Sequence, residues 1–579
     1  MTAQPTNFDD ALAYYRAKAE ERDAATNAVV QAASLKKVVV AGPGTGKTAL
    51  FAKLLEGAGG ASLTLSFINA LVDDLSLNLY GLSEVKTLHG FSVGLLQGNK
   101  GKAKVFPKLA KVIEQDAAIL LQEPDADFDK IFQLGSGDDR LLRFYKVRKD
   151  YYGTYYGFGD AIYALVKLFE KDPSRIPKFK MLLVDEYQDF NLTEVMLIDL
   201  LATRSAVLLA GDDDQSLYSD FKGASPDHIR AKYQATSGYD AFSLPFCSRS
   251  TKVIVDAAND LILSAKTRQL LGGRIAKPYV YFANENKDAE SKANPHILYT
   301  QQYEGEMLHF IEKQICAVAK VERQKFSVLI VMPPQLRNVS LPRLGKWLRK
   351  RGFRNVTFSD KRPEKEPVMI EGLKLLLKGL DDNLGWRIVA RQLLAADEFE
   401  ALVRDTTLDR RFHELIPEKT KIEVREMVRT LKKIRDGKEA KEGALQSLVR
   451  HLDYDPYKIV VQNIREDFLA DDDGDSIAPR AVRSIPITIT TIPSAKGLSA
   501  DYVFITHFDD QYYTIGGVVN DREVFAFLVA LTRAKKKAVL ISSKDQKPEL
   551  LGWIDPSRIE VRLDAPHTRR RPAVSVGAA

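Results

Sequence analysis

The sequence predicts an α/β fold with two separate α/β units, each interrupted by a helix-rich insertion. Short apolar runs alternate with segments of helical period, which is typical of buried parallel strands joined by helices. These runs fall into two sets, and the chain of 579 residues is too long for a single hydrophobic core. Strands are expected at 38–40, 62–67, 181–184 and 207–210 in the first unit, and at 297–299, 327–331, 487–490, 502–506 and 538–542 in the second.

The same patterns give the expected domain boundaries. One helical insertion should separate two parts of the first unit, and another should separate two parts of the second. In the second insertion, 423–434 and 444–452 have helical period, and the acidic run 471–475 is expected to be a solvated loop. The expected ranges are 1–91 and 180–245 for the first unit, 92–179 for its insertion, 246–358 and 484–560 for the second unit, 359–483 for its insertion, and 561–579 for a basic, disordered tail.

Composition and cysteine content exclude several classes of protein. No apolar stretch is long enough to span a bilayer, and no signal peptide is recognisable. Cys247 and Cys316 are the only cysteines, which excludes a disulfide scaffold and a four-cysteine iron–sulfur cluster and fits a reducing cytoplasm. The net charge of +7 permits a polyanionic partner, although many soluble proteins carry such a charge.

A glycine-rich segment after the first strand predicts a phosphate-binding loop. It follows the apolar run 37–40 and precedes a helical stretch at 49–56, which is the context that such a loop requires. Its glycines let backbone N–H groups surround phosphate oxygens at a helix N-terminus. Lys47 should reach the β- and γ-phosphates, and the Thr48 hydroxyl should ligate Mg²⁺. The segment is Ala41-Gly42-Pro43-Gly44-Thr45-Gly46-Lys47-Thr48.

Acidic and polar residues follow two later strands of the first unit. Asp185 and Glu186 come directly after the strand at 181–184. Asp185 could hold a metal ion and Glu186 could orient and deprotonate the attacking water, whereas the alternative is a helix-capping acidic turn. Gln215, after the strand at 207–210, could sense the γ-phosphate. Tyr218 and Phe221 could stack on bases, or they could simply pack in the core.

The motifs of this chain, in their order, resemble those of superfamily-one DNA helicases of the UvrD/Rep/PcrA type. The resemblance covers both units and implies two RecA-like P-loop domains that use ATP and Mg²⁺. It also implies translocation on single-stranded DNA with 3′-to-5′ helicase polarity. The matching segments are the phosphate loop, 65–69 (Leu-Ser-Phe-Ile-Asn), 87–91 (Thr-Leu-His-Gly-Phe), 185–189 (Asp-Glu-Tyr-Gln-Asp), 211–216 (Gly-Asp-Asp-Asp-Gln-Ser), 247–251 (Cys-Ser-Arg-Ser-Thr), 491–498 (Thr-Ile-Pro-Ser-Ala-Lys-Gly-Leu) and 528–535 (Leu-Val-Ala-Leu-Thr-Arg-Ala-Lys).

The resemblance assigns roles to residues in these segments. Arg249 and Arg533, from the second unit, should act as arginine fingers on the γ-phosphate, so that hydrolysis depends on domain closure. Gly497 should lie at the nucleotide. The single-strand path should be lined by Phe67, Asn69, Thr87, His89, Tyr218, Phe221 and Lys222.

The chain departs from the family pattern where the family contacts base and sugar. Ser248 replaces a tyrosine that stacks on adenine, Ser499 replaces a glutamate that touches ribose, and 24–29 lacks an adenine-reading glutamine. Pro493 also replaces a histidine in a strand-contacting motif. The phosphate-facing residues are retained. These departures predict intact hydrolysis with weakened nucleoside recognition.

The residues leave other functions open. The short insertions and the lack of a fused nuclease favour, modestly, an NTP-gated nucleic-acid sensor that regulates a separate nuclease subunit in antiviral defence. An RNA helicase is a second alternative.

Two basic segments have competing interpretations. The basic and aromatic segment 143–152 could grip a strand, but an amphipathic helix with a solvated basic face is favoured. In 346–351, Trp347 and Leu348 should face the core.

Overall fold

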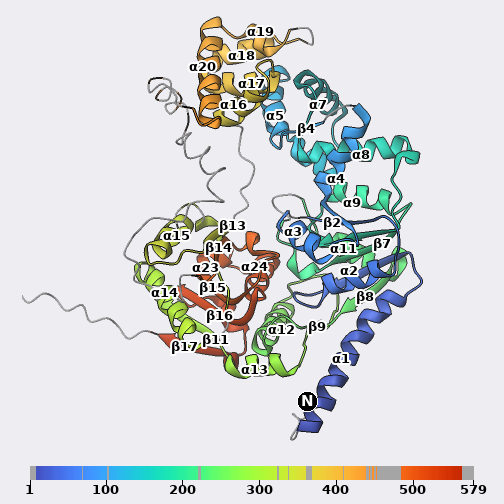
Figure 1. Cartoon of the computed structure of the whole chain (residues 1–579), viewed down its shortest axis with the longest axis vertical. Coiled ribbons are helices and arrows are strands. Elements are labelled where there is room, and N and C mark those ends of the chain that lie inside the picture. Colours follow the sequence, from blue (N-terminus) through green and yellow to red (C-terminus); the bar gives the residue numbers. More distant parts are fainter. Residues whose placement is uncertain are drawn as a thin grey trace, which may run out of the picture.

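The structure is a computed structural model that describes residues 8–67, 69–100, 103–218, 223–322, 325–336, 338, 340–359, 368–407, 410–438, 443, 446, 448, 452 and 484–563. Its two main sheets are both entirely parallel and lie in separate α/β units (Figure 1). The predicted α/β class with two P-loop-type units is therefore confirmed. The acidic run 471–475, most of 444–452 and residues 564–579 of the expected tail lie outside the described residues.

The first unit contains a six-stranded sheet in the order β3-β2-β6-β7-β1-β8. All four predicted strands are present, and their apolar residues are almost fully buried because helices cover both faces. The two edge strands, β3 and β8, were not predicted. The bounds are β1 Lys36–Ala41, β2 Ser62–Ser66, β3 Glu84–Thr87, β6 Met181–Val184, β7 Ala206–Gly211 and β8 Asp240–Leu244.

The second unit contains a seven-stranded sheet in the order β13-β14-β12-β15-β16-β11-β17. It includes all five predicted strands. Its last strand pairs with β11 and ends at Leu563, beyond the expected boundary at 560. The bounds are β11 Ile297–Gln302, β12 Val328–Met332, β13 Val356–Ser359, β14 Ile487–Thr491, β15 Ala500–Thr506, β16 Ala534–Ser543 and β17 Ile559–Leu563.

Helices flank both sheets. Those of the first unit are α1 Phe8–Gln31, α2 Lys47–Glu56, α3 Asn69–Asn78, α4 Leu88–Lys100, α9 Leu192–Leu201 and α11 Asp227–Tyr233. Those of the second are α12 Lys252–Thr267, α13 Glu285–Ala293, α14 Glu304–Val321, α15 Ser340–Lys350, α23 Asp510–Tyr513 and α24 Asp521–Leu531. Short strands β9 Phe246–Cys247 and β10 Val280–Tyr281 pair beside α12. On α15, Leu348 is fully buried and Trp347 packs against the same core, as predicted.

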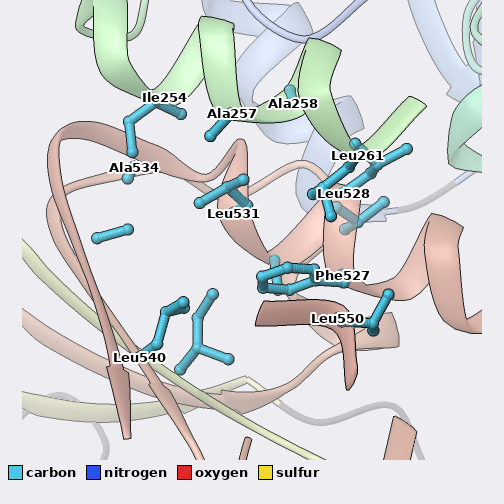
Figure 2. Close-up of a cluster of buried hydrophobic side chains, with 14 of the residues drawn as sticks. Ile254, Ala257, Ala258, Leu261, Phe527, Leu528, Leu531, Ala534, Leu540 and Leu550 are labelled. Carbon is cyan, nitrogen blue, oxygen red and sulfur yellow. The ribbon is translucent and has the colours of Figure 1, made fainter. Parts of the chain in front are cut away.

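The core of the second unit fixes the end of α24. Small residues of α12, Ala257 and Ala258, let it approach α24 closely, where Phe527, Leu528 and Leu531 are buried (Figure 2). Figure 2 also shows Leu540 of β16 beneath this layer. Because the helix is held along its length, the segment that follows it, which carries Arg533, has a defined position relative to the sheet.

The two insertions pack against each other. In Figure 1 the helices of the second insertion lie beside α5 and α7 of the first. Leu375, Leu384 and Ile388 belong to the same buried cluster as residues of the first insertion. The first insertion contains α5 Leu109–Leu120, α6 Phe128–Leu134, α7 Asp139–Tyr152, α8 Phe158–Lys171 and the paired strands β4 Lys104–Val105 and β5 Tyr155–Tyr156; the second contains α16 Met369–Lys378, α17 Asn383–Leu393, α18 Ala396–Arg404, α19 Phe412–Leu415 and α20 Glu418–Arg435.

A buried ion cluster joins the insertions. The Asp116 carboxylate of α5 is fully buried and accepts hydrogen bonds from Arg148 of α7, at 2.6 Å, and from Arg387 of α17, at 2.9 Å. Burial favours the neutral acid, but the two arginines outweigh it and hold the pKa of Asp116 below its usual range. The basic segment 143–152 therefore forms an amphipathic helix, as favoured, except that Arg148 is inside an ion pair.

Among the described residues, no helix is both long enough and apolar enough to cross a membrane.

Candidate functional site

The phosphate loop connects β1 to α2, and two of its glycines adopt backbone conformations that residues with a side chain rarely adopt. Gly44 (φ 73°) and Gly46 (φ 96°) are in the left-handed region. A Cβ at Gly44 would lie 2.3 Å from Cβ of Arg249, so this position also requires the absence of a side chain. The Thr45 hydroxyl donates to the Gly42 carbonyl oxygen at 2.9 Å and holds the loop. Lys47 and the half-buried Thr48 begin α2, as the motif predicts.

The predicted acid pair lies at the carboxyl end of β6. Asp185 and Glu186 are both buried, and Glu186 has a left-handed backbone (φ 54°), which is uncommon for a residue with a side chain. Burial and the Glu186 charge raise the pKa of Asp185 to about 7. Oδ1 of Asp185 has no hydrogen-bond partner within the part of the chain that is described. A buried carboxyl oxygen of this kind and the Thr48 hydroxyl are oxygen donors of the type that Mg²⁺ prefers.

Two lysines pair with Glu186. Nζ of Lys47 lies 3.2 Å from Oε1, and Nζ of Lys496, from the second unit, lies 3.5 Å from Oε2. Burial favours the neutral acid, but Lys47 and then Lys496 outweigh it, so the pKa of Glu186 is held well below its usual range. The two lysines therefore favour the ionised form of Glu186, which is the form that a general base requires.

Gln215 joins the two units. Its Nε2 donates to Asp212 at 2.7 Å, and its Oε1 accepts from Nη2 of Arg533 at 3.0 Å. Burial, and then the charge of Arg249, lower the pKa of Arg533 to about 10. The like charges of Arg249 and Arg533 repel each other, and an anion such as phosphate between them would relieve that repulsion.

The segment 247–249 of the second unit contacts the phosphate loop directly. The Ser248 N–H donates to the Gly44 carbonyl oxygen at 3.0 Å, and its hydroxyl donates to the same oxygen at 3.3 Å. Arg249 follows, with its Cβ against Gly44. Gly497, with φ 88°, comes directly after Lys496. The structure thus brings the predicted residues together where the two units meet beside the phosphate loop: Lys47, Asp185, Glu186, Gln215, Arg249 and Arg533.

Two further residues of this cleft had no predicted role. Lys496 is nearly fully buried; it also pairs with Asp189 at 2.6 Å and donates to the Gln215 carbonyl oxygen. Lys496 lies in the segment 491–498, which matches a family motif, and this position could have pointed to a role in the site. The Tyr279 hydroxyl donates to the Pro43 carbonyl oxygen at 3.1 Å, and its ring lies where a Cβ on Gly42 would be, 2.8 Å from Cδ2. No motif pointed to Tyr279.

The predicted DNA contacts lie along the carboxyl edge of the first sheet. Phe67 follows β2, and its ring centroid is 5.2 Å from that of the buried Tyr218, whose hydroxyl donates to the Pro493 carbonyl oxygen at 2.8 Å. Thr87 ends β3 and accepts from the Gly90 N–H at 3.0 Å. Nε2 of His89 lies 3.5 Å from Oε1 of Glu194.

Three predicted DNA contacts cannot be placed in this way. Asn69 begins α3, but its side chain is outside the described residues, as are Phe221 and Lys222 altogether.

The fold and the cleft define a P-loop protein with two RecA-like units, and sequence comparison places it among known proteins. Residues 141–237 match the family model described as UvrD/REP helicase N-terminal domain. The chain is therefore related to UvrD- and PcrA-type DNA helicases over this part of its length.

Individual relatives agree with the family match. The chain is 35% identical over 120 residues to "ATP-dependent DNA helicase PcrA" of Staphylococcus aureus (strain Mu50 / ATCC 700699), covering 20% of this chain and 16% of the relative. It is 36% identical over 117 residues to the protein of that name from Bacillus subtilis (strain 168), covering 19% and 16%. It is 34% identical over 116 residues to "DNA helicase II" of Haemophilus influenzae (strain ATCC 51907 / DSM 11121 / KW20 / Rd), again 19% and 16%. The match thus spans about a sixth of the length of these relatives.

Proposed function

We propose that this protein is an ATP-dependent translocase on single-stranded DNA, with helicase activity of 3′-to-5′ polarity. The observation that carries the proposal is the bond between Gln215 of the first unit and Arg533 of the second, at 3.0 Å. Groups from both units meet at one phosphate loop, so hydrolysis depends on how the units are arranged. A cycle of hydrolysis is then a cycle of unit movement, which is what a translocase requires.

The residues of the cleft support a hydrolytic mechanism. A triphosphate on the loop would draw Lys47 away from Glu186 because phosphate oxygens carry the larger negative charge. Lys496 would keep Glu186 ionised, so that it accepts a proton from the attacking water. Asp185 and Thr48 are the residues that would hold Mg²⁺, which when bound neutralises part of the phosphate charge.

Arg249 and Arg533 complete this mechanism from the second unit. Their guanidinium groups would stabilise the charge that develops on the γ-phosphate. Arg533 is held in place by Nε, which donates to the Val529 carbonyl oxygen at 2.9 Å.

Contacts near the proposed strand path connect it to the nucleotide cleft. Tyr218 is bonded to Pro493, and Lys496 in the same segment reaches Glu186. A strand that moved Tyr218 would move this segment too. DNA binding should therefore stimulate hydrolysis.

Steady-state hydrolysis of ATP by the full chain, with and without single-stranded oligonucleotide, tests the proposal. We expect hydrolysis that DNA stimulates and that Lys47→Ala abolishes. Lys53→Ala is the matched control, since Lys53 is an exposed lysine on the same helix. No hydrolysis by the wild-type chain would refute the proposal.

Unwinding of partial duplexes tests the polarity. A duplex with a 3′ single-stranded tail should be unwound and one with a 5′ tail should not. Hydrolysis without unwinding of either substrate, together with a nuclease that co-purifies with the chain, would instead favour the regulatory-subunit alternative.

A further inference from the structure

Three consecutive aspartates at the end of β7 surround a lysine from another part of the chain. Carboxylate oxygens of Asp212, Asp213 and Asp214 lie within 4.8 Å of one another and are all buried. Such a cluster resembles a cation site, but the ammonium group of Lys277 occupies its centre. Lys277 lies 2.9 Å from Asp212 and 2.9 Å from Asp214 and also pairs with Asp213, with only 3% of its side chain exposed.

Two arginines complete the charge balance of this cluster. Arg274 donates to both oxygens of Asp214, at 2.7 and 2.8 Å, and Arg230 donates to Asp213 at 3.1 Å. Three carboxylates therefore face three cations. Asp212 differs from its neighbours because Lys277 pairs with only one of its oxygens, and no described cation pairs with the other, which accepts from the Gln215 amide.

The hydrogen-bond partners of Gln215 determine whether its amide nitrogen or its amide oxygen faces Asp212. A carboxylate such as Asp212 only accepts hydrogen bonds and a guanidinium such as Arg533 only donates them. The amide nitrogen must therefore face Asp212 and the amide oxygen must face Arg533, which is the orientation observed, at 2.7 and 3.0 Å. If the amide rotated by half a turn, its NH₂ group would face Arg533, and two groups that only donate hydrogen bonds would then meet.

We propose that Asp212, held by Lys277, is a positioning residue for nucleotide hydrolysis that fixes the amide orientation of Gln215 and thereby the contact with Arg533. The inference rests on the proposed hydrolytic function. Asp212 acts through Gln215 and is not itself assigned a contact with the nucleotide.

Two isosteric substitutions separate positioning from general stability. Asp212→Asn removes the obligate acceptor, because an asparagine can present either an oxygen or an NH₂ group to Gln215. Asp213→Asn is the matched control: it removes one charge from the same cluster but has no described bond to Gln215. Asp212→Asn should lower kcat about 10- to 100-fold with KM for ATP within about threefold, since misorientation affects the chemical step. Asp213→Asn should leave kcat within about twofold.

A donor–acceptor exchange tests the orientation itself. Gln215→Glu places a second carboxylate against Asp212 and should also lower kcat. In the double variant Asp212→Asn/Gln215→Glu, the amide introduced at position 212 can donate to the carboxylate introduced at position 215. The other oxygen of that carboxylate still accepts from Arg533, and the net charge of the wild type is retained. The double variant should recover at least about tenfold in kcat over Gln215→Glu alone, because coupled residues are not additive.

The outcomes separate the inference from the proposed function. Equal effects of Asp212→Asn and Asp213→Asn on kcat, or a double variant no better than its worse parent, would overturn the positioning role while wild-type hydrolysis stands. If the wild-type chain hydrolyses no nucleotide, the proposed function fails, and the exchange is judged by thermal unfolding. There the double variant should be more stable than Gln215→Glu, and an unimproved melting temperature would overturn the proposed orientation.

Discussion

At the scale of single residues, Glu186 shows how both units place charge around one carboxylate. It lies between Lys47 of its own unit and Lys496 of the other, at 3.2 and 3.5 Å. Only Lys47 is on the phosphate loop, so in the proposed mechanism only Lys47 would be drawn to phosphate. Glu186 would then pair with Lys496 alone, and it would remain charged until it accepts a proton from a water molecule.

Glu186→Gln should reduce the rate of ATP hydrolysis by about 10²- to 10⁴-fold, the range of a general base. Nucleotide binding should be retained, because the phosphate loop and Lys47 are unchanged. Single-turnover hydrolysis and equilibrium binding of a labelled nucleotide measure the two effects separately. Glu56→Gln changes an exposed carboxylate at the far end of α2 and should affect neither. Hydrolysis at the wild-type rate in Glu186→Gln would remove Glu186 from the mechanism.

The departures around the nucleoside predict relaxed base specificity. Ser248 uses both its N–H and its hydroxyl on the Gly44 carbonyl oxygen, so this side chain is bonded to the loop. A site that recognises mainly triphosphate and Mg²⁺ discriminates poorly between bases. We expect kcat/KM for GTP to approach that for ATP, within about tenfold. The comparison of ATP, GTP, CTP and UTP on one oligonucleotide measures this, and a strong preference for ATP would show that other residues read the base.

Some site residues could be predicted because they lie in sequence motifs, whereas others were missed because their contacts form only in the folded chain. Lys47, Asp185 and Glu186 lie in motifs whose spacing carries the chemistry, so they could be named in advance. Lys277 and Tyr279 bind the first unit from a loop after α12 and belong to no motif. Their roles arise only when folding brings that loop against β7 and the phosphate loop.

At the scale of elements, the central strands were predictable and the edge strands were not. Strands covered on both faces are continuous apolar runs, such as 38–40 and 328–331. β3 (Glu-Val-Lys-Thr) and β17 (Ile-Glu-Val-Arg-Leu) are edge strands with exposed or half-buried residues and mixed polarity. Their short alternating pattern gives a weak signal.

Helix α8 in the first insertion carries a buried acid that should make stability depend on pH. Asp160 lies in its first turn and is 4% exposed. Burial, opposed in part by Lys149, raises the pKa of Asp160 to about 7. A raised carboxyl pKa means that the native state keeps a proton that the unfolded chain loses near pH 4. Stability from this group is therefore present at low pH and is lost as the pH rises toward 7.

Asp160→Asn removes this dependence, because the amide cannot ionise. The gain in stability over the wild type should be larger at pH 8 than at pH 5 by about 2–3 kcal/mol. Chemical unfolding at the two pH values measures it. Glu170→Gln, an exposed position on the same helix, should show no such difference. A gain that is the same at both pH values would mean that Asp160 is ionised throughout.

At the scale of the whole molecule, the second insertion is joined to the first insertion by its core and by buried charge. Lys108 pairs with Glu371 at 2.9 Å, Asn383 donates to the Tyr151 carbonyl oxygen at 3.0 Å, and Arg387 reaches Asp116. These contacts tie helices of the second insertion to the side of the first unit, although the second insertion interrupts the sequence of the second unit. When the cleft between the units changes, the joined insertions should therefore follow the first unit.

Arg387→Met tests how strongly the insertions are joined. It keeps an unbranched apolar side chain but removes the guanidinium group, so that Arg148 is the one remaining described cation on the buried Asp116. Breaking a buried ion pair costs about 3–5 kcal/mol. Because the molecule has several cores, the loss should be local: hydrogen exchange in α5 and α17 should speed up while β1 and β6 keep their protection. Arg391→Met, an exposed position on the same helix, should leave the exchange pattern unchanged. Unaltered exchange in Arg387→Met would show that apolar packing alone holds the insertions together, whereas faster exchange throughout the chain would show that they unfold with the sheets as one cooperative body.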